Sequence, residues 1–408
     1  SIFVNNGNLQ FRDVTNQVAP EVINCGLVTS GIWTDVDGDS WLDLLVTHEW
    51  GPVKLFRNDK GILKEETGSA GLAPHTGWWN SISAGDFDRD GDIDYIAGNF
   101  GRNTKYHPTA AKPELLFYGR FDDTGQPHLI EAKLDENGAI LPRRGFSCSR
   151  EAMPGLHGKM KTFTNFAGSS LEQIYDPSLL AKAHRFEAST FDSVLISNDG
   201  SGKFKITPLP ELAQIAPTFG IAVADFDLDG WLDLVLAQNF YTSQKETGPM
   251  DGSLSLFLRG NPNASGPDDQ FIPMWPRESG ILVPGDAKSA GVGDINGDLR
   301  PDVLIGVNNG PPRLFLNQSS QPGISIRLIG KAGNPNAIGA RVIAEFDDEK
   351  VQIREIHAGG GYLTQDSSGL ILKKPEGNGS IKVIWPDGKT SLRKIDSAES
   401  EVEFTEPE

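Results

Sequence analysis

The chain has 408 residues, a formal net charge of −18, 46 glycines and 26 prolines. Such an excess of carboxylates repels phosphate backbones and argues against nucleic-acid binding, and no apolar run is long enough to span a bilayer. The many glycines and prolines predict short strands joined by turns rather than long helices.

A nine-residue loop rich in aspartate occurs four times along the chain. The copies run over residues 35–43, 86–94, 225–233 and 294–302. Short side-chain oxygens occupy positions 1, 3, 5 and 9 of each copy, and a glycine at position 4 or 6 permits a tight turn. This pattern predicts calcium, because Ca²⁺ takes about six to eight oxygen ligands and alternating aspartates on a curled loop supply them.

One Ca²⁺ ion per loop, about four in all, is therefore expected. A backbone carbonyl at position 7 would complete each site, whereas Mg²⁺ fits less well because it prefers few protein ligands. The predicted metal-binding residues are Asp35, Asp37, Asp39, Trp41, Asp43, Asp86, Asp88, Asp90, Asp92, Asp94, Asp225, Asp227, Asp229, Trp231, Asp233, Asp294, Asn296, Asp298, Arg300 and Asp302.

Position 12 distinguishes these loops from EF-hands, which need a glutamate there. The residues at that position are Val46, Ala97, Leu236 and Ile305, and each lies in an apolar run that favours a strand. The predicted unit is therefore strand, Asp loop, strand. Four copies in one register favour calcium over ordinary Asp-Gly turns.

A fifth copy, from Arg120 to His128, is degenerate. It keeps Asp122 at position 3 and Gly125 at position 6, but Arg120 and His128 replace the first and last carboxylates. We expect no metal at this loop, with the guanidinium of Arg120 occupying the charge position. A calcium ion bound there would contradict this hypothesis.

Repeated strand–loop–strand units of this size predict an all-β fold, a β-propeller. Five blades are visible within residues 1–318, and there is room for six or seven. A small helical insertion is expected at about residues 141–186, where serines stand at positions typical of helix N-caps. A small β domain at residues 319–395 and an acidic tail at 396–408 follow the propeller.

Polar and aromatic residues recur where the second strand of each unit ends. Two interpretations stay open: these residues form a rim that binds a glycan or peptide, or the amides cap backbone groups at the strand ends. The candidate rim residues are His48, Glu49, Trp78, Trp79, Asn99, Arg102, Tyr106, Asn239, Tyr241 and Asn308.

No catalytic residue is predicted. The sequence has no G-x-S-x-G nucleophile elbow, and metal binding accounts for the spacing of the aspartates. A polysaccharide lyase-like reaction, in which calcium acts with His48, His75, His107 or Tyr106 on a uronate, stays open as an alternative. It rests on fold analogy alone, so a binding protein is favoured over an enzyme.

The four Asp loops resemble the FG-GAP/VCBS repeats of integrin-type propellers. The stretches 336–341, 354–363 and 383–389 resemble an ASPIC/UnbV domain, and the stretches 77–81 and 99–103 are similar to parts of large bacterial VCBS proteins related to cartilage acidic protein. This resemblance implies an exported calcium-binding propeller, located in the periplasm, at the cell surface or outside the cell. It implies no particular reaction.

Residues 2–14 depart from the family pattern. They resemble the outer hairpin that follows an Asp loop, yet no Asp loop precedes them. Either the hairpin closes the ring against the last blade, which we slightly favour, or the chain is the carboxy-terminal part of a longer protein. Cys25 and Cys148 form one disulfide or remain buried thiols, and the sequence leaves both open.

The tail carries three consecutive glycines between His357 and Tyr362. They permit a sharp turn or a close backbone approach, and we expect this stretch to pack against the propeller. The whole pattern predicts a calcium-binding extracellular binding or assembly module that recognises a glycan or protein partner. The alternatives are a calcium-dependent carbohydrate-active enzyme and a subunit or fragment of a larger surface complex.

Overall fold

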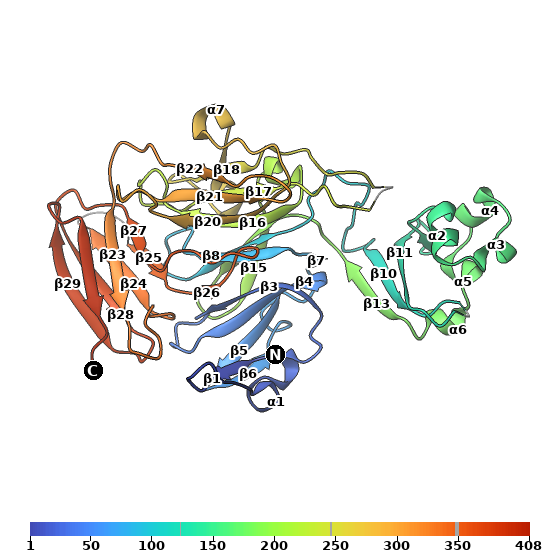
Figure 1. Cartoon of the computed structure of the whole chain (residues 1–408), viewed down its shortest axis with the longest axis horizontal. Coiled ribbons are helices and arrows are strands. Elements are labelled where there is room, and N and C mark those ends of the chain that lie inside the picture. The colour runs from blue at the N-terminus through green and yellow to red at the C-terminus, as the bar shows by residue number, and fades with distance from the viewer. Residues whose placement is uncertain (123, 245–246, 347–350) are drawn as a thin grey trace.

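The computed structural model describes residues 1–122, 124–244, 247–346 and 351–408 (Figure 1). Antiparallel sheets dominate it and the helices are few and short, which confirms the predicted all-β class. Among the described residues, no helix combines the length and the apolar composition needed to cross a membrane.

Four sheets of the propeller type, here called blades 1 to 4, carry the four Asp loops. In every blade the Asp loop joins the first strand to the second, as the repeat predicts. From the inner strand outward, the strands are β3 (Leu27–Thr34), β4 (Asp43–Pro52), β5 (Lys54–Asp59) and β6 (Ile62–Glu65) in blade 1; β8 (Ser81–Gly85), β9 (Asp94–Gly98), β14 (Val194–Asn198) and β15 (Phe204–Pro208) in blade 2; β16 (Thr218–Ala224), β17 (Asp233–Gln238), β18 (Leu256–Gly260) and β19 (Phe271–Met274) in blade 3; and β20 (Ala287–Gly293), β21 (Asp302–Val307) and β22 (Arg313–Phe315) in blade 4.

The core of this region lies between the faces of successive blades. Leu45 of blade 1 packs into one cluster with Tyr95 and Ala97 of blade 2. The same arrangement recurs further along the chain, with Ile96 of blade 2 packing in one cluster with Leu234 of blade 3. Alternation along each second strand explains this, since successive side chains point to opposite faces of a sheet and both faces are covered.

The blades form an arc in the described part of the chain rather than a closed ring. The inner strand β8 contacts β3 on one side and β16 on the other, and β16 contacts β20, but no comparable contact joins β20 to β3. The expectation of six or seven blades, with five visible, is therefore corrected to four blades in the described residues. The spacing of the loops was misleading because one blade contains a long insertion.

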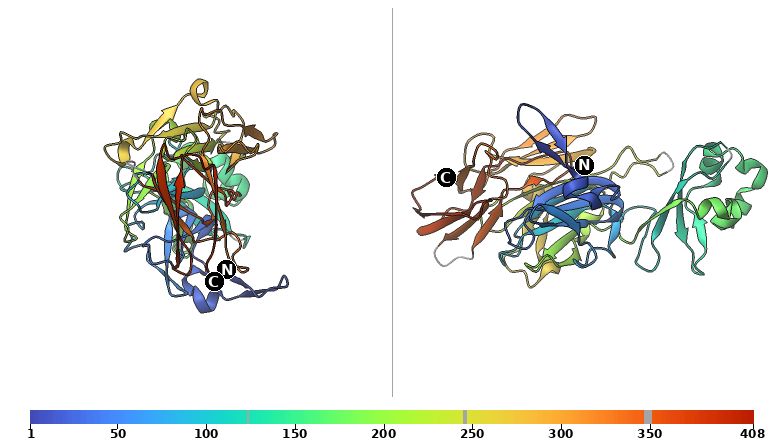
Figure 2. Two further views of the ribbon diagram at one scale, coloured as in Figure 1. Left: turned by 90° about the vertical axis from the view of Figure 1, so that its left-hand side faces the viewer. Right: turned by 90° about the horizontal axis from the view of Figure 1, so that it is seen from below.

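That insertion occupies residues 99–193, between β9 and β14 of blade 2, and projects from the blades on the side opposite the carboxy-terminal domain (Figures 1 and 2). Its sheet and helices are β10 (Glu114–Gly119), β11 (His128–Leu134), β12 (Ile140–Pro142), β13 (His184–Ala188), α2 (Phe146–Ala152), α3 (Leu156–Lys159), α4 (Phe163–Ala167), α5 (Leu171–Ile174) and α6 (Pro177–Leu180). The helices lie where the sequence predicts them, but the insertion begins about forty residues earlier than expected because β10 and β11 belong to it.

The amino-terminal hairpin consists of β1 (Phe3–Asn5) and β2 (Phe11–Asp13), which pair with each other in a two-stranded sheet. It projects from the body of the molecule (Figure 2), so the favoured expectation that it closes the ring against the last blade is wrong for the described structure. The following segment, α1 (Thr15–Val18) and η1 (Pro20–Val22), covers one face of blade 1, where Ala19 packs with Leu44 and Val46.

The carboxy-terminal domain is a pair of sheets with its own core around Trp385. Residues 396–408, expected to be an acidic tail outside the domain, contain a strand that pairs in parallel with the first strand of the domain, so they belong to it. The strands are β23 (Ile324–Ile329), β24 (Arg341–Phe346), β25 (Gln352–Glu355), β27 (Leu370–Leu372), β28 (Asn378–Ile384), β29 (Thr390–Asp396) and β30 (Glu401–Thr405).

Residues 357–369, here called the axial segment, leave this domain and run along the inner strands of the blades. Within it, β26 (Ala358–Gly359) pairs with β3 of blade 1, Gly361 bridges to Ile82 of blade 2, and Asp366 accepts a hydrogen bond from the N–H of Val292 in blade 4. This confirms the expectation that the glycine-rich stretch packs against the propeller.

The remaining elements are β7 (Thr76–Trp78), η2 (Glu211–Gln214), η3 (Pro267–Asp269) and α7 (Pro276–Ser279).

Candidate metal centres

The structure brings together the carboxylates at positions 1, 3 and 5 of three Asp loops. We call the loops 1 to 4, after their blades. In loops 1, 2 and 3, one carboxylate oxygen from each of these positions lies within 4.8 Å of the others; the groups are Asp35, Asp37 and Asp39; Asp86, Asp88 and Asp90; and Asp225, Asp227 and Asp229. Loop 4 has the same backbone frame but carries Asn296 at position 3.

The loops curl in the same way because their backbone N–H groups turn inward. In loop 1, the N–H groups of Gly38, Asp39 and Ser40 all donate to the carboxylate of Asp35. The residue at position 7 then donates its N–H to the carboxylate at position 5, as Trp41 does to Asp39 at 2.8 Å. The same hydrogen bond forms in the other three loops, from Asp92, Trp231 and Arg300.

The aspartate at position 9 closes each loop. It is almost fully buried in all four blades. One of its oxygens accepts the N–H of position 2, and the other accepts an N–H from the third strand; in loop 1 these donors are Val36 at 3.0 Å and Asn58 at 2.7 Å. The equivalent residues are Asp94, Asp233 and Asp302.

The closing role of position 9 was not foreseen from the sequence, which assigned these residues only as metal ligands. The signal that could have revealed it is the residue type in the third strand, where Asn58, Asn198 and Asn317 each follow the outer apolar run. Their side-chain amides also donate to the backbone carbonyl just before position 9. Three of the four blades therefore use one asparagine to hold the loop to the sheet.

Loop 2 contains a buried carboxylate without a hydrogen-bond partner. The side chain of Asp86 is 1% exposed, and neither of its oxygens has a hydrogen-bond partner. Burial raises the pKa of Asp86 to about 7. The positive charge of Arg354 acts against this shift without cancelling it, so a cation coordinated by the Asp86 oxygens would stabilise the buried carboxylate further.

Burial acts in the same direction on aspartates at positions 1 and 9 of the first three loops. It raises the pKa of Asp43 to about 7 and that of Asp94 to about 8, and it raises the pKa of Asp225 to about 7. Each of these shifts says that the charged carboxylate is disfavoured by its surroundings in the absence of a cation. The donor set fits Ca²⁺, since it consists of several hard oxygens and contains no cysteine or histidine.

Comparisons with known proteins agree with this geometry. Residues 35–97, which contain loops 1 and 2, match the model of the FG-GAP-like repeat, and residues 330–408 match the model described as ASPIC and UnbV. The chain thus combines an FG-GAP-like repeat region with an ASPIC and UnbV region. The second match covers most of the carboxy-terminal domain, including the axial segment and β30.

The chain is also similar to two curated proteins over part of its length. The chain is similar to integrin alpha-3 of Cricetulus griseus, with 24% identity over 202 residues that make up 46% of this chain and 18% of that protein. It is also similar to integrin alpha-3 of Mus musculus, with 27% identity over 153 residues, 35% of this chain and 13% of the relative. The chain therefore spans less than a fifth of the length of these relatives.

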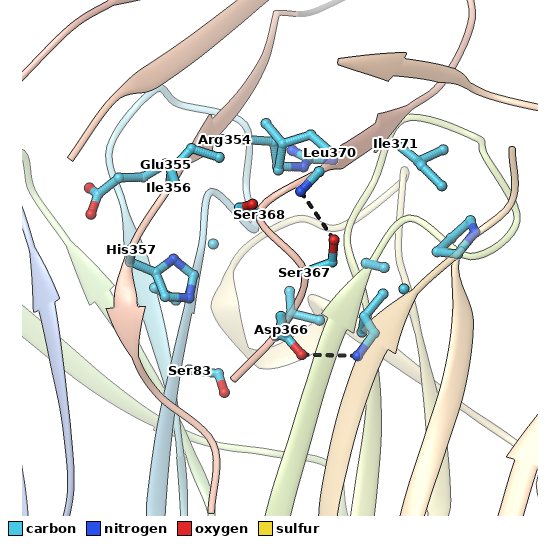
Figure 3. Close-up of a pocket in the computed structure, with 18 of the residues that line it drawn as sticks. Ser83, Arg354, Glu355, Ile356, His357, Asp366, Ser367, Ser368, Leu370 and Ile371 are labelled. Atoms are coloured by element: carbon cyan, nitrogen blue, oxygen red, sulfur yellow. Dashed lines mark hydrogen bonds between the residues drawn. The ribbon is translucent and has the colours of Figure 1, made fainter. Parts of the chain in front are cut away.

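The ASPIC and UnbV region reaches the FG-GAP loops through two charged residues that the sequence did not single out. Glu355 is buried, and its Oε2 accepts the N–H of Asp35 at 3.3 Å. Arg354 and Asp225 both line a cavity of about 280 Å³, and Figure 3 shows Arg354 among its lining residues. Burial raises the pKa of Glu355 to about 8. Nothing local marks these residues, because they meet the loops only through the docking of the two regions.

The degenerate fifth loop does not belong to a blade. It is the turn between β10 and β11 of the insertion, where Thr124 donates its N–H and hydroxyl to Asp122. Its His128 lies 3.4 Å from the same carboxylate, and residue 123 is outside the described residues. The absence of metal at this turn remains a prediction.

Half of the predicted rim is buried, which corrects that part of the assignment. Asn99 and Asn239 are fully buried and hydrogen-bond to backbone groups, as the capping interpretation holds. Trp79 is also fully buried, His48 is 1% exposed and Tyr106 is 5% exposed. These five residues cannot contact a ligand from solvent. Burial of His48 and Tyr106 also weakens the lyase-like alternative, which named both.

The other five rim residues remain accessible in part but do not form one patch. Trp78 stacks on Phe100 with ring centroids 4.4 Å apart. Arg102 pairs with Asp192 and Glu211 beside the insertion. Tyr241 and Asn308 lie together around a separate hollow near blade 4, and the remaining residue is Glu49. Cys25 and Cys148 are not joined in a disulfide, and Cys148 accepts a hydrogen bond from Gln244.

Proposed function

We propose that this protein is a calcium-binding extracellular module whose Asp loops hold Ca²⁺ between the first and second strands of each blade. The observation that carries the proposal is the Asp86 carboxylate, which is buried without a hydrogen bond of good geometry to either oxygen and lies beside two further carboxylates of the same loop. The similarity to integrin alpha-3 supports an extracellular setting and a protein or glycan partner.

The carboxylates at positions 1, 3 and 5 would supply the side-chain oxygens for the ion in each loop. Calcium would offset the mutual repulsion of the clustered aspartates, which is the chemistry that the bound ion contributes. The protein's own part is to hold the loop closed through the buried aspartate at position 9, so that the three carboxylates face one another before the ion arrives.

A thermal unfolding experiment tests the proposal. The melting temperature of the chain is measured after treatment with EDTA and again with excess CaCl₂ or MgCl₂. We expect calcium to raise it by several degrees or more, because a ligand that binds only the folded state stabilises it by mass action. An identical melting curve in EDTA and in calcium would refute the metal-binding function.

A matched pair of variants locates the effect in the loops. Asp88→Asn removes one ligand charge from loop 2, whereas Asp135→Asn removes a carboxylate from a turn of the insertion that is outside every loop. The calcium-induced rise in melting temperature should shrink in the first variant and stay unchanged in the second. An equal rise in both variants would place the ion elsewhere.

A further inference from the structure

The carboxy-terminal domain lies against the Asp loops of all four blades. In loop 4, the backbone carbonyl of Leu299 at position 6 accepts the N–H of Gly323, the residue before β23, at 2.8 Å. In loop 2, a Cβ at Gly91, which is again position 6, would lie 3.6 Å from Cδ1 of Ile353. Position 6 is therefore part of the surface on which the domain rests.

Loops 1 and 3 meet the domain through apolar side chains. Leu42 at position 8 of loop 1 lies beside Gly339, where a Cβ would be 3.3 Å from the leucine Cδ1. Leu228 at position 4 of loop 3 lies beside Gly323, where a Cβ would be 3.3 Å from the leucine Cδ2. Ile353 of the domain also belongs to a core cluster that contains residues of blades 1 and 2. Apolar packing therefore continues from the arc into the domain.

Position 6 is also bonded to the candidate calcium ligand at position 1. The N–H groups of Ser40 in loop 1, Gly230 in loop 3 and Leu299 in loop 4 donate to the position 1 aspartate of their own loop, at 2.9, 2.8 and 2.9 Å. Leu299 thus holds Asp294 through its N–H and the start of the domain through its carbonyl. An ion that fixes the position 1 carboxylate also fixes the residue that the domain contacts.

Docking brings a buried negative charge next to loop 1. Glu355 is 9% exposed, and its Oε2 accepts the N–H of Asp35 and the hydroxyl of Thr34, both at 3.3 Å. Its Oε1 has no hydrogen-bond partner in the described part of the chain. A cation in loop 1 would stabilise this carboxylate, and the carboxylate would in turn attract the cation.

Docking also brings a positive charge toward loops 2 and 3. Burial lowers the pKa of Arg354, and the negative charges of Asp225 and Asp86 oppose that shift. The two loops contain nine aspartates, which is more negative charge than two Ca²⁺ ions, Arg89 and Arg259 neutralise together. Arg354 and calcium are therefore both attracted to these loops, and neither has to displace the other.

We propose that calcium in the Asp loops and docking of the carboxy-terminal domain strengthen each other, so that removal of calcium loosens the domain from the arc. This inference rests on the calcium-binding function proposed above and goes beyond it, because it gives the loops a partner within the same chain. An ion that orders a loop lowers the entropic cost of docking on that loop. By reciprocity, the docked domain raises the affinity of the loops for calcium.

Hydrogen exchange on the full chain tests the coupling away from the loops themselves. Gly360 of the axial segment donates its N–H to Gly31 at 3.0 Å, and Gly361 donates to Ile82 at 2.7 Å. Both acceptors stand four residues before the loop of their blade. We expect the two glycine amides to exchange about tenfold more slowly in CaCl₂ than in EDTA, a size typical of coupling between two sites. Amides that join β24 to β28 inside the domain should not change.

Two pairs of variants test the reverse direction, from docking to calcium affinity. Glu355→Gln removes the charge that docking brings to loop 1, and its control Glu345→Gln removes an exposed charge of β24. Ile353→Ala removes apolar packing at the interface without changing a charge, and its control is Leu392→Ala at a residue that is 68% exposed. By isothermal titration calorimetry, both interface variants should bind calcium about fivefold more weakly than the unmodified chain. Both controls should bind it as the unmodified chain does.

The outcomes separate this inference from the calcium-binding function. If calcium binds but the exchange of Gly360 and Gly361 does not slow, or slows no more than that of the amides inside the domain, the coupling is overturned and the function stands. Interface variants that bind calcium as tightly as their controls have the same consequence. If the unmodified chain does not bind calcium, both proposals fail together. The exchange measurement needs no substitution, so it decides the matter even where a variant does not fold.

Discussion

The first and last blades of the arc share the same strand arrangement, but only the first has its outward face covered by another segment. The second residue after position 9 is Leu45, Ile96 and Val235 in blades 1 to 3, and each is at most 1% exposed because the next blade covers it. In blade 4 the equivalent residue is Leu304, which is 47% exposed, and its cross-strand neighbour Leu314 is 48% exposed. At the other end, the amino-terminal segment around Ala19 covers blade 1.

This difference shows that the apolar pattern of a blade does not by itself say whether the blade is covered. All four second strands are apolar on both faces, as expected for a sheet packed on two sides. On the face of this second residue, three of them are covered by the next blade within the described residues, and in blade 4 the corresponding face stays exposed. An equivalent apolar side chain therefore contributes differently to the free energy of unfolding in different blades.

The largest expected effect comes from placing a charge at equivalent positions of blades 3 and 4. Val235→Asp buries a carboxylate between two blades and should destabilise the fold by more than about 4 kcal/mol or prevent folding. Leu304→Asp places the same charge on an exposed face and should change stability by less than about 0.5 kcal/mol. Urea unfolding followed by circular dichroism measures both.

A large loss of stability in Leu304→Asp would contradict the exposure of this face of blade 4, since it would mean that the face is covered in solution. In that case the mass of the unmodified chain, measured by light scattering, would show whether a second copy covers it. Equal, small effects in the two variants would instead contradict the stacking of blades 3 and 4.

A smaller effect is expected where the axial segment joins blade 1. Gly359 has φ of +86°, and a Cβ there would lie 2.3 Å from the carbonyl oxygen of Gly31. Gly388 has a similar φ of +78° and open space around it. Gly359→Ala should cost about 3 kcal/mol and Gly388→Ala about 1 kcal/mol in the free energy of unfolding, because only the first adds a clash to the backbone strain.

Hydrogen exchange shows where in the structure the Gly359→Ala substitution acts. In Gly359→Ala, protection should decrease in β3, where the axial segment pairs, and should stay unchanged in β24 and β28 of the carboxy-terminal core. Equal stability of the two alanine variants would mean that the axial segment does not pair with blade 1.

The smallest expected effect is at Asp366, where the axial segment reaches blade 4. Burial raises the pKa of Asp366 from its ordinary value of 3.8 to about 6. A raised carboxyl pKa means that the folded state holds the proton more tightly than the unfolded state, so this contribution to stability is full below about pH 4 and is lost as the pH rises through about 6.

Asp366→Asn removes this titration and can still accept the N–H of Val292 through its amide oxygen. We expect the variant to be more stable than the unmodified chain at pH 7, by about 1 kcal/mol because the side chain is partly exposed, and to match it near pH 4. Urea unfolding at several pH values, with calcium held constant, measures the difference. A difference that does not change between pH 4 and pH 7 would contradict the assignment.

Much of the local structure could be predicted from the residues alone. The nine-residue register places Asp35 at the start of a loop and Asp43 at the start of a strand, and the structure confirms both. The apolar residue at position 12 correctly excluded an EF-hand. The helices α5 and α6 also lie within the stretch predicted to be helical; Ser170 is at the N-cap of the first as expected, whereas Asp176 rather than a serine is at the N-cap of the second.

Other expectations failed because they depended on contacts between distant segments. The fifth loop, Arg120 to His128, has the spacing of a repeat but lies in an insertion, since β10 pairs with β11 and β13 rather than with a blade. The rim assumed that polar residues at strand ends face solvent. Asn99 instead hydrogen-bonds to the backbone of Thr190 and Asp192, more than ninety residues away.

The amino-acid sequence alone specifies the curl of the Asp loops, because the aspartate at position 1 accepts backbone N–H groups from within the same nine residues. It also specifies the alternation of each strand and hence the all-β class. Only the tertiary structure decides how many blades stack, where Leu304 is left exposed, and that Glu355 meets Asp35 or Arg259 meets Asp227. Those contacts join segments whose sequence separation carries no local signal, so folding alone brings the charges of the loops and their counterions together.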